Sequence, residues 1–156
     1  MAEILINQEL RMSNVLSLRK RLSASEVHHE TERIEQFVES GGYKKTGAKV
    51  SATFAIEYEN GVQILDVELL IPLDKPFTPP CGCVCKPEFK LTNAVSLRCT
   101  GGPIKIQEAG VKLHEFIVEN KMTPITCGYN VIVQEAKADV ENLIVDIFVG
   151  ISPNIL

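Results

Sequence analysis

Three closely spaced cysteines give the chain its first candidate for chemistry. Cys81-Gly82-Cys83-Val84-Cys85 places three thiols at alternate positions. Thiolates bind soft metal ions such as Cu(I) or zinc, but structural zinc sites use Cys pairs spaced C-x₂₋₄-C, and no second pair and no nearby histidine follow this run. The spacing leaves open a metal site, a redox site and cysteines that pack as small hydrophobes or lie in a surface loop. We favour the last, and the sequence predicts no metal, cofactor or catalytic residue.

A second candidate is a set of polar side chains at alternate positions of expected strands. Alternate side chains of a strand lie on one face of a sheet. A partly desolvated carboxylate attracts a cation more strongly than one in bulk water, and a Phe ring stacks on aromatic ligands. We therefore predict that a small molecule contacts six residues on this face: Glu57, Asp66, Glu68, Gln134, Asp146 and Phe148.

An ordinary solvated sheet surface is the alternative for this face. Arg19 and Arg98 share it, and pairing with Asp66 and Asp146 across neighbouring strands would cancel its electrostatic field. Small side chains that would leave room for a ligand are expected on the same face at Ser51, Thr53 and Ala55. From the second half, Asn130 and Ile132 are expected there too.

The elements that must position these side chains follow from the hydrophobic pattern. Residues 3–22 alternate as a strand, and Ser23-x-x-Glu26 has the form of a capping box that begins a helix ending at Gly41-Gly42. Strands are expected over 50–58, with Val50 and Ala52 among the apolar set facing the helix, and over 63–73. Asn60-Gly61 between them predicts a tight hairpin turn.

The second half repeats this order. Ser96-Leu97-Arg98 lies 79 residues after Ser17-Leu18-Arg19, and Gly128 lies 81 residues after Gly47. Pro103 suits the first position of a second helix, and two strands follow it. The half-repeats run over about 4–73 and 89–151, and a Pro- and Cys-rich connector spans 74–88.

Fold class follows from this repeat. Each half, at roughly 75 residues, is too small to bury a good core alone. The prediction is a single α+β domain over residues 1–156, in which duplicated β-α-β-β halves form one curved antiparallel sheet. Two helices then cover one face, and a central groove lies on the other.

Composition excludes some classes of function. The net charge of −4 and the lack of a basic stripe give no electrostatic footprint for nucleic acid. No apolar run approaches the ~20 residues of a membrane span, and no secretory signal opens the chain. We therefore expect a cytoplasmic protein with neither a nucleic-acid nor a membrane partner.

The pattern resembles the GyrI-like effector-binding domain family. The resemblance rests on the strand, turn and helix start in Ser96-Leu97-Arg98-Cys99-Thr100-Gly101-Gly102-Pro103, on Phe37 and Phe116 near the helix ends, and on Ile56-Glu57-Tyr58-Glu59-Asn60. It implies a duplicated β-α-β-β fold whose groove binds bulky cationic or aromatic compounds. At the positions where the family often carries a glutamate and a tyrosine in the second half, this chain has Ile132 and Gln134.

The sequence thus favours a stand-alone module that binds a bulky hydrophobic or cationic small molecule, rather than an enzyme. One alternative is an interaction protein that uses the same fold to bind a protein partner. Another is a small xenobiotic hydrolase in which Glu57 or Glu68 activates water. The sequence gives neither the ligand nor the oligomeric state.

Overall fold

The computed structural model describes residues 3–134 and 142–153. By Cα distances the chain divides into two compact units, which we name after their helices. The α1 unit is Met12–Phe89, and the α2 unit is Lys90–Leu156 with Met1–Arg11. The described elements, in chain order, are β1 (Leu5–Leu22), α1 (Ala24–Ser40), β2 (Val50–Glu59), β3 (Val62–Pro72), β4 (Val84–Thr100), α2 (Pro103–Glu119), β5 (Pro124–Gln134) and β6 (Ile144–Ile151). The predicted α+β class with antiparallel strands and two helices is confirmed.

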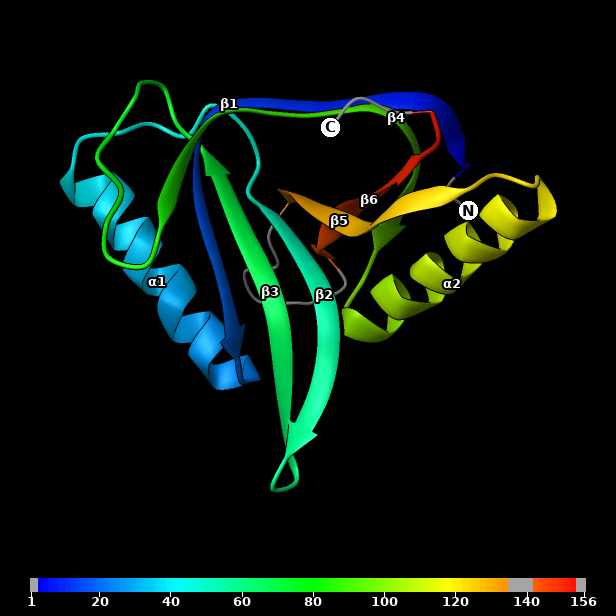
Figure 1. The fold of residues 1–156 in the computed structure, drawn as a ribbon, viewed down its shortest axis with the longest axis horizontal. Coiled ribbons are helices and arrows are strands. Elements are labelled where there is room, and N and C mark those ends of the chain that lie inside the picture. Colours follow the sequence, from blue (N-terminus) through cyan, green and yellow to red (C-terminus); the bar gives the residue numbers. More distant parts are fainter. Residues whose placement is uncertain (1–2, 135–141, 154–156) are drawn as a thin grey trace. The chain divides into compact units, whose positions relative to one another are not determined.

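In the α1 unit, β3 pairs antiparallel with β1 on one side and with β2 on the other, and α1 packs beside β1 and β3 (Figure 1). The helix buries Ile34 and Val38 against alternate strand residues, as the predicted apolar stripes require. At the hairpin, Asn60 and Gly61 have φ of 51° and 79°, the left-handed values that a type I′ turn needs. The core of this unit consists of Leu16, Leu18, Ile34, Val38, Leu69, Ile71, Leu73 and Cys83.

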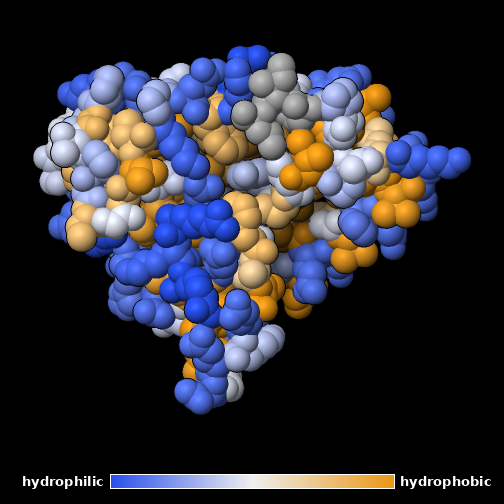
Figure 2. All heavy atoms as spheres, in the orientation of Figure 1, coloured by the Kyte–Doolittle hydropathy of each residue, from blue (hydrophilic) through white to orange (hydrophobic). Residues whose placement is uncertain are grey.

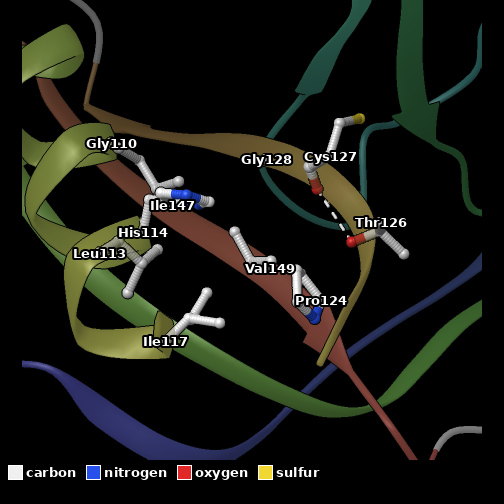
Figure 3. Close-up of a pocket in the computed structure, with 10 residues that line it drawn as sticks. All are labelled: Gly110, Leu113, His114, Ile117, Pro124, Thr126, Cys127, Gly128, Ile147 and Val149. Carbon is white, nitrogen blue, oxygen red and sulfur yellow. Dashed lines mark hydrogen bonds between the residues drawn. The ribbon is translucent and has the colours of Figure 1, made fainter. Parts of the chain in front are cut away.

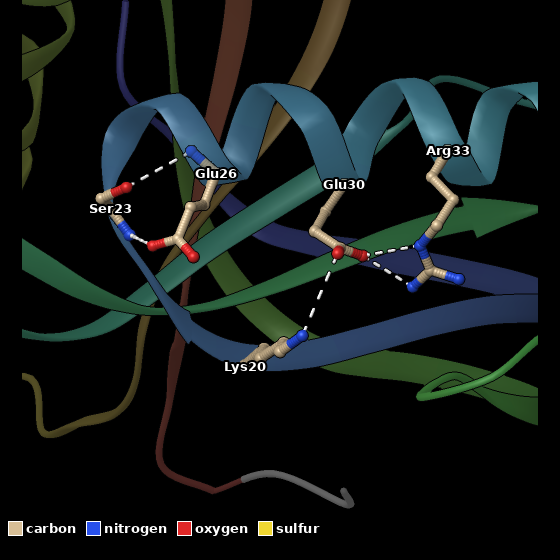
Figure 4. Close-up of polar contacts among 5 residues, drawn as sticks. All are labelled: Lys20, Ser23, Glu26, Glu30 and Arg33. Carbon is tan, nitrogen blue, oxygen red and sulfur yellow. Dashed lines mark hydrogen bonds and ion pairs between the residues drawn. The ribbon is translucent and has the colours of Figure 1, made fainter.

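The capping box at the start of α1 is confirmed. The Ser23 hydroxyl accepts a hydrogen bond from the Glu26 amide, and the Glu26 carboxylate accepts one from the Ser23 amide at 3.0 Å (Figure 4). The hydrogen bond from the Ser23 backbone lowers the pKa of Glu26. Further along the helix, Glu30 binds Arg33 at 2.6 Å and lies 4.0 Å from the Lys20 ammonium, so β1 and α1 are also joined by charge.

In the α2 unit, β6 pairs antiparallel with both β4 and β5. Pro103 occupies the first turn of α2, where its missing N–H costs nothing. Leu113 and Ile117 are the buried residues of this helix. The core of this unit consists of Val95, Leu97, Leu113, Ile117, Val145, Ile147 and Ile151.

The two units share element order and strand pairing. Both helices have 17 residues, and α2 begins 79 residues after α1, at Pro103 and Ala24. Arg19 lies opposite Glu68 in the β1–β3 pair, and Arg98 lies opposite Asp146 in the β4–β6 pair. Positions in β3 and β6 therefore correspond at an offset of 78, so that Glu68, rather than Asp66, matches Asp146. That the units arose by duplication, and that they form one sheet with a central groove, stays a prediction.

The expected orientation of β2 is wrong over its first half. Val50 lies opposite Leu70 and Ala52 opposite Glu68, on the face away from α1. The register then shifts between Thr53 and Ala55, so that Phe54 is an extra residue, a β-bulge. Because a bulge moves every later side chain to the other face, Glu57 lies on the face predicted for it, while Ser51 and Thr53 lie on the helix face.

The predicted orientation of β5 is also wrong over part of the strand, because β5 has a β-bulge at the corresponding place. The register shifts between Ile132 and Gln134, 79 residues after the shift in β2. Before it, Tyr129 and Val131 lie opposite Phe148 and Asp146, on the helix-free face. Asn130 and Ile132 consequently lie on the helix face, contrary to prediction, whereas Gln134 lies on the face predicted for it.

Two further findings concern the start of β4 and the character of the helices. β4 begins at Val84, inside the expected connector over 74–88, and runs from one unit into the other. Among the described residues, neither helix is long and apolar enough to cross a membrane.

The capping box leads to a stability prediction. Ser23→Ala should lower the free energy of unfolding by about 1 kcal/mol, because the Glu26 amide loses its acceptor. Urea denaturation followed by circular dichroism measures this change. Ser40→Ala, at the other end of α1, is the control and should change stability much less. Equal losses in both variants would contradict a capping role.

Candidate functional site

The six residues predicted to contact a ligand fall into two groups of three. Glu57, Asp66 and Glu68 lie on the helix-free face of the α1 unit. Gln134, Asp146 and Phe148 lie on the helix-free face of the α2 unit.

Glu68 differs from the other carboxylates because it is buried. Its side chain is 7% exposed. The Ser17 hydroxyl and the Lys86 ammonium both donate to its Oε2 atom, each at 2.6 Å. Ser17 is also buried, as is Leu70 directly opposite it, so this part of the face is not the solvated sheet surface of the alternative hypothesis. A buried ion pair is weak evidence for stability but is common at functional sites.

The other two carboxylates of this unit form exposed ion pairs. Asp66 accepts two hydrogen bonds from Arg19, both at 3.3 Å. Arg21 donates to Glu57 at 2.7 Å and to Glu59 at 2.9 Å, and these contacts raise the pKa of Arg21, with the Glu59 hydrogen bond the largest cause. Figure 2 shows mostly hydrophilic atoms over this hairpin, at the lower end of the view. Pairs this exposed contribute little to stability.

The α2 unit carries the corresponding charge pair. Arg98 binds Asp146 through two hydrogen bonds of 2.8 and 3.0 Å, and the pKa of Arg98 is raised chiefly by this contact. Phe148 is partly buried opposite the buried Ser96. The Gln134 amide is exposed and donates to the Asn142 carbonyl at 2.7 Å.

All four predicted carboxylates therefore have a basic partner. The pairing of Arg19 with Asp66 and of Arg98 with Asp146, the alternative expected from the sequence, is confirmed. An exposed pair of this kind has little field left to attract a cation. Glu68 is the exception, because burial reduces solvent screening and strengthens any interaction it makes.

The three closely spaced cysteines do not line one side of a strand. Cys81 is exposed in a turn, Cys83 is buried in the core of the α1 unit, and Cys85 is intermediate. Burial raises the pKa of the Cys83 thiol, partly opposed by Arg33. Within residues 3–134 and 142–153, no three His, Cys, Asp or Glu side chains are grouped so as to hold a metal ion.

The structure also contains a pocket that the sequence did not predict. It has a volume of about 350 Å³ and lies in the α2 unit between α2 and strands β5 and β6 (Figure 3). Two of its lining residues are glycines, Gly110 in the helix and Gly128 in β5. A glycine inside an amphipathic helix was the signal in the sequence, because glycine is unfavourable there.

Comparison with known proteins places the fold. No protein-family model and no curated protein matches the chain. The crystal structure of the EcmrR C-terminal domain is 16% identical with a TM-score of 0.79, over 97% of this chain and 98% of that one. In a cryo-EM structure of an EcmrR–DNA complex, the EcmrR chain is 14% identical with a TM-score of 0.80, over 96% of this chain and 57% of that one. This chain thus spans little more than half of that EcmrR chain.

A third match comes from a structure with a ligand. SAV2435 bound to tetraphenylphosphonium is 10% identical with a TM-score of 0.54, over 98% of this chain and 94% of that one. At such identities the likeness concerns the fold alone. It is consistent with the GyrI-like effector-binding fold expected from the sequence.

The Glu68–Lys86 pair leads to a second stability prediction. Lys86→Met should lower the free energy of unfolding by about 1–3 kcal/mol, because it leaves a buried carboxylate without its cation. Urea denaturation of Lys86→Met, Glu68→Gln and the double variant forms a double-mutant cycle. Losses in the two single variants that simply add would show that the pair is not coupled.

Burial of Cys83 leads to a prediction about reactivity. At pH 8 iodoacetamide should modify Cys83 at least about tenfold more slowly than Cys81, because a raised pKa leaves less thiolate and the side chain is less accessible. Peptide mass spectrometry over time measures both rates in one sample. Equal rates under native conditions would contradict the burial of Cys83, and equal rates in urea are the control.

Proposed function

We propose that this protein is a small-molecule-binding module whose ligand is a hydrophobic compound with a delocalised positive charge, held by Glu68. The observation that carries the proposal is the buried carboxylate on the helix-free face of the α1 unit. The shared fold with SAV2435, whose structure holds tetraphenylphosphonium, supports this ligand class.

The hydrogen bonds of Glu68 leave it able to accept another partner. Ser17 and Lys86 both donate to Oε2, and among the described residues no hydrogen bond to Oε1 is found. Lys86 is 36% exposed and has a long flexible side chain, so its ammonium group can move away from Glu68 into water, where it is fully hydrated. We infer that a ligand cation replaces Lys86 at Glu68, which keeps the buried carboxylate paired throughout.

The surroundings of Glu68 suit a hydrophobic ligand. Ala52 lies directly opposite it on β2, and Val50 and Leu70 follow on the same face. Near this group Phe54, the bulge residue, has the Arg19 guanidinium 3.9 Å above its ring. A cation therefore already occupies an aromatic face in this unit. A compact, strongly hydrated cation would lose more hydration here than a delocalised one does.

The remaining predicted residues keep secondary roles in this proposal. Glu57 and Asp66 add negative charge that their arginines largely offset. Gln134, Asp146 and Phe148 are proposed to contact a small molecule on the helix-free face of the α2 unit. We also infer that the two units arose by duplication, which is supported by the 79-residue offset of their helices and of their β-bulges.

Binding of a protein partner is the second candidate function. It is favoured by two large hydrophobic side chains on one face of the β2–β3 hairpin, Ile56 and Tyr58, which are 57% and 70% exposed. Exposed apolar side chains that lie together are typical of interaction surfaces.

Titration with tetraphenylphosphonium tests the first candidate. Saturable binding should raise the melting temperature, since the ligand stabilises the folded state by linkage. Glu68→Gln should weaken binding at least about tenfold, because the ligand cation loses the carboxylate that holds it; a factor of ten corresponds to about 1.4 kcal/mol of binding free energy. Lys86→Met should strengthen binding, because the internal competitor is gone. Glu59→Gln, an exposed carboxylate of the same unit, is the matched control and should leave affinity unchanged.

Two results would overturn the proposal. One is a Glu68→Gln variant that folds normally and binds tetraphenylphosphonium as the unaltered protein does. The other is the absence of any saturable binding, in which case the hairpin residues and a protein partner become the better explanation.

A further inference from the structure

We infer that the pocket beside α2 is a second, separate binding site, which takes a neutral, flat, bicyclic aromatic molecule. This goes beyond the proposed function, since every residue involved belongs to the α2 unit and none belongs to the Glu68 site. Three features support this site: the lining of the pocket, the two glycines that open it and the different side chains in the corresponding region of the α1 unit.

The lining is apolar and comes from two sides. Gly110, Leu113, His114 and Ile117 form one face of α2, at helical spacings of three and four residues, and Ile147 and Val149 of β6 lie across from them (Figure 3). Leu113, Ile117 and Ile147 are buried. Among the described residues, no Asp, Glu, Lys or Arg lines the pocket. An uncharged ligand therefore fits it better than an ion does.

The size of the pocket sets the size of the ligand. Ligand pockets in proteins measure about 300–1,000 Å³, and a dry apolar cavity of about 150 Å³ is enough to hold benzene. At about 350 Å³ the pocket is roughly twice that size and lies at the small end of the ligand range. Two fused aromatic rings match this volume.

Both glycines occupy positions where the backbone does not require them. Neither Gly110 nor Gly128 has the positive φ that favours glycine. A Cβ atom at Gly110 would meet nothing within 4 Å, and one at Gly128 would make an ordinary contact, 3.4 Å from Ile147. Glycine inside a helix is unfavourable compared with alanine. What the two glycines provide is empty space between the helix and the sheet.

The α1 unit has charged side chains at the corresponding positions. Subtracting 79, the offset of the helices, places Glu35 at the position of His114, Lys45 at that of Pro124 and Lys49 at that of Gly128. The Glu35 carboxylate lies 2.6 Å from the Lys45 ammonium and 3.7 Å from that of Lys49. There an ion-pair network joins the helix to the segment before β2. The α2 unit has a cavity at the corresponding place.

One side chain on the rim offers a polar contact. The Thr126 hydroxyl is already used, because it accepts from the Gly150 amide at 2.8 Å and donates to the Cys127 carbonyl at 2.9 Å. The Cys127 thiol points away from the helix in Figure 3. His114 is exposed and lies at the edge of the pocket, where its imidazole can pair with a single hydroxyl group. A bicyclic phenol therefore meets both the apolar lining and the rim.

2-Naphthol is the probe for this site, used with the full chain. Isothermal titration should show one saturable site, and nuclear Overhauser contacts should join the naphthol protons to methyl groups of Leu113, Ile117 and Ile147. Naphthalene, which lacks the hydroxyl group, should bind more weakly, and His114→Ala should remove that preference.

Two variants of one glycine separate filling of the pocket from changes in the helix. Gly110→Ala and Gly110→Leu both replace glycine with a better helix former. Gly110→Ala leaves most of the space and should keep 2-naphthol affinity within about twofold, whereas Gly110→Leu fills the space and should reduce affinity at least about tenfold. Both should melt no lower than the unaltered protein, which shows that the fold is intact.

The outcomes separate this inference from the proposed function. Unchanged 2-naphthol binding in a folded Gly110→Leu variant would overturn the pocket, as would the absence of contacts to the three methyl-bearing residues. Gly110→Leu should bind tetraphenylphosphonium normally, and Glu68→Gln should bind 2-naphthol normally. If Gly110→Leu instead abolished binding of both probes, the two sites would not be separate and the inference would fail.

Discussion

The alternation of side chains along each strand determines which residues either face of a unit carries. Each successive residue points to the opposite face, so a single extra residue exchanges the two faces for all that follow. β2 has such a residue in Phe54 and β5 has one in Val133. These two β-bulges decide which residues pack against the helices and which lie on the helix-free faces.

On the helix-free faces, charges are placed in pairs, and burial distinguishes one pair from the others. Arg98–Asp146 and Arg19–Asp66 are screened by water and contribute little. The Glu68–Lys86 pair has one partner almost fully buried and the other partly exposed. Burial keeps the carboxylate in need of a partner, and the exposure of Lys86 is the reason for proposing that its cation is exchanged for a ligand.

The two units show how one local fold can be filled differently. In the α1 unit, Glu35 joins the helix to Lys45 and Lys49 in the segment before β2. An aromatic cluster of Phe37, Tyr43 and Phe77 packs near the end of the helix. In the α2 unit, glycines at Gly110 and Gly128 leave a cavity between the same elements. Backbone hydrogen bonding sets the element order, whereas side-chain volume decides whether space remains.

The sequence specifies the elements through local signals: the capping box at Ser23, the Asn60-Gly61 hairpin and the apolar faces of both helices, which no distant residue overrides. It also placed Glu68 on the correct face. Three features became visible in the folded chain alone: Ser51 and Asn130 face the helices, the buried Glu68 pairs with Lys86, and a pocket lies beside α2. The reason is physical. A β-bulge, an ion pair between distant residues and a cavity each depend on strand register and packing, which a linear pattern does not contain.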